Sequence, residues 1–262
     1  MKTSRVLNTE ILFQLFVKFI KPELICDIGT LDASHSILLR KISSSAKIIA
    51  FEANPYNYQK IIDTGLAELN NISVIHKAVS NNSEQLVFHV QKHSNSNEDY
   101  WKAGTSSILQ RNQSVGDTEE VKVDAIRLDD FLLKTQNFSS SIALWIDVEG
   151  AGYEVLEGIK GIAKDITFLQ VEVESEEVWK DQKLKVDVQK ILTDLGFVEV
   201  GRGKHDEQHD LVFVNQRYLV DNSTKCNTLV TLAIIFYYIR KYGGHILSNI
   251  LLVPILGIWR NN

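Results

Sequence analysis

The sequence predicts a doubly wound, Rossmann-like α/β domain with a mostly parallel sheet, an antiparallel last strand and a C-terminal helical appendage. Short, nearly continuous apolar runs alternate with segments of helical spacing between residues 23 and 215, as expected for strands covered on both faces. Several of these runs end in an acidic residue or a glycine. A polar turn separates the last two runs, 197–203 and 210–216, which favours an antiparallel pair.

The elements are expected in a regular order along the chain. Residues 1–22 carry an apolar stretch that Gln14 and Lys18 interrupt, and no small-residue cleavage site follows, so we expect an amphipathic helix and not a signal peptide. Strands are expected at 23–29, 47–54, 72–80, 84–91, 119–126, 141–150 and 166–174. Helices are expected at 34–42, 55–69, 152–159 and 176–196, the last ending at Gly196.

The composition limits the domain organisation, the cellular setting and the kind of partner that can be expected. The 262 residues are 44% hydrophobic and 23% charged, which fits one large domain, residues 23–215, between the N-terminal helix and a tail at 216–262. Two cysteines, Cys26 and Cys226, cannot form a disulfide framework, so a reducing, cytoplasmic setting is expected. The net charge is −5 although the tail has five basic residues and one acidic residue, so the body is acidic. An acidic body argues against a nucleic-acid partner.

The ends of the predicted strands are where a ligand is expected. Doubly wound sheets bind ligands outside the carboxyl ends of their strands, where the strand order reverses. Four of the five relevant strand ends carry a carboxylate, and the five segments are Asp27–Gly29, Glu52–Asn54, Ala78–Ser80, Asp147–Gly150 and Glu172–Glu174.

The first turn, "CDIGTLDASHS", limits the choice of cofactor. Gly29 has no β-carbon and permits close approach of a ligand, and Glu52 can accept hydrogen bonds from both hydroxyls of a ribose. Alternatively, Asp27 and Glu52 only cap the helices that follow them. The turn lacks the three glycines of a dinucleotide site and places Asp32 where phosphates would lie, which disfavours NAD and ATP. S-adenosylmethionine has a sulfonium cation and no phosphate, and it tolerates acids there.

An ordered series of motifs resembles the FkbM family of S-adenosylmethionine-dependent methyltransferases, over about residues 20–215: "ICDIGT", "IIAFEANPYNYQKI", "VIHKAVSNNSEQL", "AGTSSIL", "VDAIRLDDFL", "LWIDVEGAGYEVLEGI" and "DLVFVN". The resemblance implies a class I methyltransferase fold and methyl transfer to a hydroxyl oxygen of a sugar, glycan or natural product. The cofactor-binding residues expected on this basis are Asp27, Gly29, Thr30, Glu52, Asn54, Ala78, Val79 and Asp147.

Four positions depart from the family pattern. Leu31 and Ala33 stand where the family usually has Asn and Gly, Trp145 stands where it usually has Lys, and Gly152 where it usually has Glu. These departures keep an alternative open, in which the chain is a catalytically degenerate methyltransferase fold that serves as a binding or scaffold module.

Candidate catalytic residues follow the fourth core strand. Asp147 and Glu149 lie two residues apart and face the same side of a regular strand, so their repulsion raises one pKa and suits a general base. With Glu172 they could instead hold a hard divalent cation, although we predict no metal. Glu149 could also simply begin the next helix. His209, which with His205 flanks the last turn, could act as base if that turn folds over the pocket, or lie on the surface.

The polar segment 92–117 is long enough to be a lid or an acceptor-binding element. Its Tyr100 and Trp101 could stack on a sugar face or pack on the sheet edge.

"ANPY" at 53–56 resembles a signature of DNA and protein amino methyltransferases, but it follows the second strand and not the fourth. A small-molecule or glycan acceptor is therefore expected.

The tail carries two apolar stretches, 228–239 and 246–259, separated by "RKYGGH". Each is shorter than the roughly 20 residues that cross a bilayer. With Arg240, Lys241 and Arg260, a helix pair lying on an anionic membrane would give peripheral contact through 228–259. The alternative is packing on the catalytic domain or on a second subunit in a homodimer.

Overall fold

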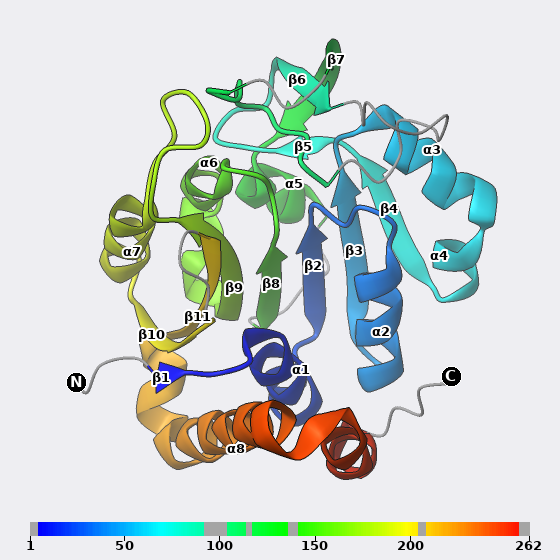
Figure 1. The fold of residues 1–262 in the computed structure, drawn as a ribbon. Coiled ribbons are helices and arrows are strands. Elements are labelled where there is room, and N and C mark those ends of the chain that lie inside the picture. The colour runs from blue at the N-terminus through cyan, green and yellow to red at the C-terminus, as the bar shows by residue number, and fades with distance from the viewer. Residues whose placement is uncertain (1–4, 92–103, 114–116, 136–140, 204–207, 257–262) are drawn as a thin grey trace.

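The computed structural model describes residues 5–91, 104–113, 117–135, 141–203 and 208–256, and the statements below concern these residues. A sheet with the strand order β1-β10-β11-β9-β8-β2-β3-β4 forms the centre of the molecule (Figure 1). In that spatial order the strands are Arg5–Val6, Phe197–Arg202, Gln208–Asn215, Ile166–Glu174, Ile142–Ile146, Leu24–Ile28, Lys47–Glu52 and Ile72–His76.

The strand directions confirm the predicted fold class. β2 runs parallel to β3 and β8, β3 to β4, and β8 to β9, whereas β11 is antiparallel to both β9 and β10. Every residue of β2 is buried, because helices cover both faces of the sheet. The strand order reverses between β2 and β8, so the carboxyl ends of these two strands form the switch point of the fold.

Helices form a layer on each face of the sheet (Figure 1). One apolar cluster joins it to α1 (Thr9–Ile20), α2 (Ser34–Ile42) and α8 (Gln216–Leu256). The other joins it to α5 (Leu128–Lys134), α6 (Gly152–Glu157), the 3₁₀ helix η1 (Lys160–Asp165) and α7 (Lys185–Asp194). Beside β3 and β4 lie α3 (Pro55–Thr64), whose first residue is the expected proline, and α4 (Leu66–Leu69).

A second, small sheet stands above the carboxyl ends of the parallel strands (Figure 1). It has the order β5-β7-β6, formed by Ala78–Val79, Thr118–Ile126 and Gln85–Gln91. The prediction of one strand over 72–80 is therefore wrong. The chain leaves the central sheet after His76, and β5 pairs with β7 instead.

The helix expected at 176–196 is shorter than predicted. It begins at Lys185, because the preceding residues form a loop around Trp179, whose side chain is fully buried. The side-chain oxygen of Gln182 accepts hydrogen bonds from the amides of Val178 and Trp179, which holds this loop in place. Gly196, with φ +85°, follows the end of the helix as expected.

The tail is one helix, α8, and not the predicted pair. It continues through Gly243 and Gly244, a cost of roughly 1 kcal/mol each. Its first half packs against α1 through Leu229, Ala233 and Phe236. Among the described helices, none combines the length and the apolar composition required to cross a membrane. Peripheral membrane contact and homodimer formation stay predictions.

Candidate functional site

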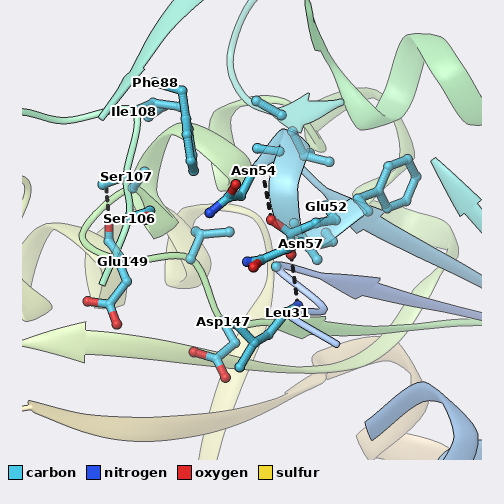
Figure 2. A pocket seen from close by; sticks show the side chains of 18 of the residues that line it. Leu31, Glu52, Asn54, Asn57, Phe88, Ser106, Ser107, Ile108, Asp147 and Glu149 are labelled. Atoms are coloured by element: carbon cyan, nitrogen blue, oxygen red, sulfur yellow. Dashed lines mark hydrogen bonds between the residues drawn. The ribbon is translucent and has the colours of Figure 1, made fainter. Parts of the chain in front are cut away.

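A pocket of about 720 Å³, its open mouth included, lies at the switch point between β2, β8 and the small sheet (Figure 2). Seven of the sequence-predicted residues line it: Gly29, Glu52, Asn54, Ala78, Val79, Asp147 and Glu149. Four predicted residues, Asp27, Thr30, Glu172 and His209, do not.

Gly29 brings the ends of β2 and β8 together. Its φ is +84°, and a β-carbon at this position would overlap the carbonyl oxygen of Asp147. The amide of Asp147 in turn donates to the carbonyl of Ile28 at 2.9 Å. Glycine is therefore required here both by the backbone conformation and by the close approach of the neighbouring loop.

Glu52 presents a buried carboxylate on the pocket wall, with the side chain 5% exposed. One oxygen accepts a hydrogen bond from the amide of Leu31 at 2.8 Å, and the other from the amide of Asn54 at 2.8 Å. Burial raises its pKa to about 7, although these amides and the side chain of Asn57 oppose the shift. The two amides and Asn57 use three of the four lone pairs of the carboxylate, which leaves acceptor capacity for a ligand hydroxyl.

Asn54 has two tasks in the pocket. Its side-chain oxygen accepts from the amide of Tyr56 at 3.0 Å and so caps α3, a role that the sequence left open for Glu52. Its side-chain nitrogen is fully buried and has no hydrogen-bond partner within the described structure. Because a buried donor without an acceptor is costly, this nitrogen is a ready contact for a ligand oxygen or nitrogen.

Asp27 and Thr30 lie behind the turn. The Asp27 carboxylate accepts hydrogen bonds from Thr30 Oγ1 at 2.7 Å and from Ser36 Oγ at 2.6 Å, and His35 Nδ1 lies 3.8 Å away. Burial alone would raise the pKa of Asp27, but the His35, Ser36 and Thr30 contacts outweigh it and lower the pKa. The structure thus gives Asp27 partners that order the turn and the start of α2.

Leu31 and Ala33, the two departures in the first turn, both adopt left-handed backbone, with φ +57° and +62°. Asn and Gly are the residues that take this conformation most readily. Leu31 and Ala33 therefore hold this turn at a conformational cost.

Trp145 does not enter the pocket. Its ring packs 3.9 Å from that of His35 and 5.1 Å from that of Phe13 between their centroids, on the face of the sheet that α1 covers. The change at this position from the usual Lys to an indole therefore leaves the pocket open.

The small sheet and the segment between β6 and β7 supply a further wall, for which the sequence predicted only Ala78, Val79 and a general role of the segment 92–117. Phe88 and Ile108 (Figure 2) form its apolar part with Val79, and Lys77, Ser106 and Ser107 also line the pocket. The motif "AGTSSIL" was the one signal in the sequence for Ser106 and Ser107. Tyr100 and Trp101 lie outside the described residues.

Asp147 and Glu149 stand together at one end of the pocket, with both carboxylates pointing away from Glu52 (Figure 2). Burial and the charges of Asp210 and Asp27 raise the pKa of Asp147 to about 6, and the smaller effects of His35 and Trp145 oppose this rise. Burial and the neighbouring carboxylates raise the pKa of Glu149 to about 8. A hydrogen bond from Ser107 Oγ to the main-chain oxygen of Glu149 fixes this loop.

Glu172 and His209 occupy other positions. Glu172 lies opposite Asp210 in the β9–β11 pairing, and burial and its acidic neighbours raise its pKa to about 9. His209 is not on a turn over the pocket as expected: it lies within β11, opposite Val173, and is buried. His205 lies outside the described residues. Carboxylate oxygens of Glu149, Glu172 and Glu174 lie within 4.8 Å of one another, a different triad from the one considered for a cation.

The family model described as the methyltransferase FkbM domain matches residues 27–199. No curated protein matches the chain.

Several solved structures resemble it at low identity. The precorrin-6y C5,15-methyltransferase from Geobacter metallireducens has 12% identity and a TM-score of 0.42, with 79% of this chain and 86% of that chain covered. A putative O-methyltransferase from Klebsiella pneumoniae has 10% identity and a TM-score of 0.44, with coverage of 82% and 83%. The N-terminal domain of EvdMO1 with SAH bound has 10% identity and a TM-score of 0.42, with coverage of 80% and 82%.

Proposed function

This chain belongs to the FkbM methyltransferase family, whose methyl donor is S-adenosylmethionine, and we propose that it methylates a hydroxyl oxygen of a sugar, glycan or natural product. The proposal rests on one observation: two different groups of polar side chains lie at opposite ends of one pocket. At one end Glu52 and Asn54 offer unused hydrogen-bonding capacity, and at the other Asp147 and Glu149 offer carboxylates with raised pKa values.

The residues at the first end suit the adenosine part of the donor. Glu52 keeps acceptor capacity for a ribose hydroxyl, and the unpaired nitrogen of Asn54 can donate to a ring or ribose acceptor. Val79, Phe88 and Ile108 offer an apolar slot for the adenine ring. The methionine end would then lie along Gly29, which lines the pocket between the ends of β2 and β8.

S-adenosylmethionine supplies an electrophilic methyl group, which an acceptor oxygen takes as the carbon–sulfur bond breaks and its electron pair stays on the sulfur. The protein aligns the two reactants and removes the hydroxyl proton. We assign Asp147 as the base, because a carboxyl with a pKa of about 6 is mostly ionised at neutral pH and still basic enough to accept a proton. Glu149, with a pKa of about 8, stays mostly protonated and can donate a hydrogen bond to the acceptor.

Calorimetric titration with S-adenosylmethionine and S-adenosylhomocysteine tests the donor site directly. We expect both to bind the purified chain. Incubation with methyl-labelled donor and a panel of sugars, glycans and hydroxylated natural products then tests the reaction. Binding of neither compound to folded protein would favour the scaffold alternative, and methylation of amines alone would contradict the hydroxyl assignment.

A further inference from the structure

A short segment, residues 104–113, links β6 of the small sheet to the loop around Trp179, and we call it the strap. It is tied to β6 by hydrogen bonds between the main chains of His89 and Ser107, at 2.8 and 3.2 Å. At its other end the amide of Asn112 donates to the carbonyl of Val178 at 3.0 Å, and the amide of Lys180 to the carbonyl of Gln110 at 2.8 Å. The strap is therefore held at both ends by backbone contacts.

The strap separates two cavities. Its first half, from Gly104 to Ile108, lines the pocket already described. Its second half lines a groove of about 830 Å³, mouth included, whose wall is formed by His89, Gln91, Gln110, Arg111, Asn112, Thr118 and Glu120. Each of the described residues that line this groove has a polar or charged side chain.

Gln91 gives the groove an unmet hydrogen-bonding group. The residue is 4% exposed, its side-chain nitrogen donates to Thr118 Oγ1 at 3.1 Å, and its main-chain amide donates to Ser106 Oγ at 3.1 Å. Its side-chain oxygen is buried and has no hydrogen-bond partner within the described structure. A buried amide oxygen without a donor is unfavourable, so this wall is suited to a ligand that brings one.

The described residues of the groove include one guanidinium, that of Arg111, and one carboxylate, that of Glu120, which lies 3.6 Å from His89 Nδ1. The remaining polar groups are the His89 imidazole, three carboxamides and a hydroxyl, and this set can both donate and accept hydrogen bonds. A phosphate or carboxylate would find one guanidinium offset by one carboxylate. Vicinal hydroxyls, which also donate and accept, match this set better.

We propose that this groove binds a neutral oligosaccharide, the part of the methyl acceptor that lies beyond the sugar being methylated. This proposal depends on the proposed function in one respect: the oligosaccharide is the methyl acceptor only if the chain is a methyltransferase. Ser107 at the pocket and Arg111 at the groove are four residues apart, at most about 14 Å along an extended chain. One acceptor of more than one sugar unit can therefore reach both cavities.

Two further contacts link the cavities. The guanidinium of Arg111 lies 5.3 Å from the centre of the Trp179 ring, and Gly150, next to Glu149, has no room for a β-carbon beside that ring. The positive charge of Arg111 also acts on the carboxyl of Glu149. The groove thus begins beside the acids assigned to the reaction.

Saturation-transfer NMR on the full chain tests the proposal, with maltotriose, mannotriose and triacetylchitotriose as probes and inorganic phosphate as the anionic comparison. We expect at least one trisaccharide to bind. Its affinity should fall roughly tenfold in Gln91→Met, which keeps the size but removes the amide, and in Gln110→Ala, at an exposed position. Gln59→Ala, exposed on α3, should have no effect.

Absence of trisaccharide binding, binding that both groove variants leave unchanged, or binding of phosphate in their place would overturn the proposal. A titration with S-adenosylhomocysteine on the same samples separates the two levels. Donor binding without saccharide binding would refute the saccharide proposal and support the methyltransferase. Saccharide binding that depends on Gln91 and Gln110, without donor binding, would support the saccharide proposal and refute the proposed reaction.

Discussion

The main-chain amide of Leu31 donates a hydrogen bond to the Glu52 carboxylate at 2.8 Å, and this joins the left-handed turn after β2 to the acid that ends β3. The turn and the acid therefore support each other: the turn needs an acceptor for its amide, and the carboxylate needs donors to stay ordered while buried. This relationship makes Glu52 the first residue to test.

Replacing Glu52 by Gln should weaken binding of S-adenosylhomocysteine. An amide cannot accept at both ends as a carboxylate does, so contacts to one hydroxyl and to one of the two main-chain amides are lost. Above the Glu52 pKa of about 7 the carboxylate is ionised, and hydrogen bonds to a charged group contribute about 1.5–3 kcal/mol each, which corresponds to a loss of at least tenfold at that pH. Calorimetry measures it, with Glu68→Gln on exposed α4 as control. Equal affinity in a folded Glu52→Gln variant would refute the ribose assignment.

Replacing Leu31 by Asn should raise the free energy of unfolding. Leu31 has φ +57°, which costs an L-residue roughly 1–2 kcal/mol and costs Asn less, so we expect a gain of up to about 1 kcal/mol. Urea denaturation measures the change. Leu133→Asn, at an exposed site in helix α5, should instead be slightly destabilising. If both variants lose stability equally, the left-handed conformation is not the source of the effect.

Replacing Asp147 by Asn should slow methyl transfer while donor binding changes little. Removal of a general base typically lowers the rate about 10²–10⁴-fold. In the unsubstituted enzyme the rate should rise with pH through about 6, because the base works in its ionised form. The Asp147→Asn variant should lack this rise. An unchanged rate, or the same pH profile in both proteins, would assign the proton transfer elsewhere.

Stability of the ligand-free protein should fall as pH increases. The pKa of Glu149 is raised from 4.5 to about 8 and that of Glu172 from 4.5 to about 9, so the folded protein holds protons that the unfolded chain releases. Their contribution is complete below about pH 4.5 and is lost progressively up to about pH 9. Urea denaturation at about pH 5.5 and about pH 8.5 checks this window. The Glu149→Gln variant should show a weaker dependence of the free energy of unfolding on pH. A protein that is more stable at the higher pH would show that the pKa shifts have the opposite sign.

Helix α8 should bring the protein to anionic membranes. Tyr238 and Tyr242 are 50% and 73% exposed, and Lys225 and Lys241 are exposed on the same helix. We expect sedimentation with vesicles that contain phosphatidylserine and not with pure phosphatidylcholine. Lys241→Glu should weaken it, by about 1 kcal/mol per basic group removed, whereas Lys180→Glu outside the tail should not. Binding to neither vesicle would favour the alternative of a tail that only packs on protein.

Much of the pocket follows from local sequence patterns. Apolar runs that end in Gly29, Glu52 and Asp147 identify parallel strands and the residues at their carboxyl ends. The chain direction then brings these residues to one edge of the sheet without any knowledge of side-chain packing. The same patterns also indicate the antiparallel last strand, because its connection to the preceding strand is too short for a crossover.

Other features depend on contacts between segments distant in the sequence. The partners of Asp27 come from the start of α2, so its place behind the turn could not be read from the "CDIG" motif alone. Trp179 ends up buried in a loop because Gln182 and Gly150 fit around it, although the surrounding residues have helical spacing.

The sequence by itself therefore determined the α/β fold, the switch point and the acids around it, because each depends on short-range periodicity and on the regular geometry of parallel strands. Only the tertiary structure decided that Asp147 and Glu149 line the pocket while Glu172 does not. It also decided that the strap has a polar groove on its outer part and that α8 is a single helix. These features result from how distant segments pack together, and such packing leaves no periodic pattern in the sequence.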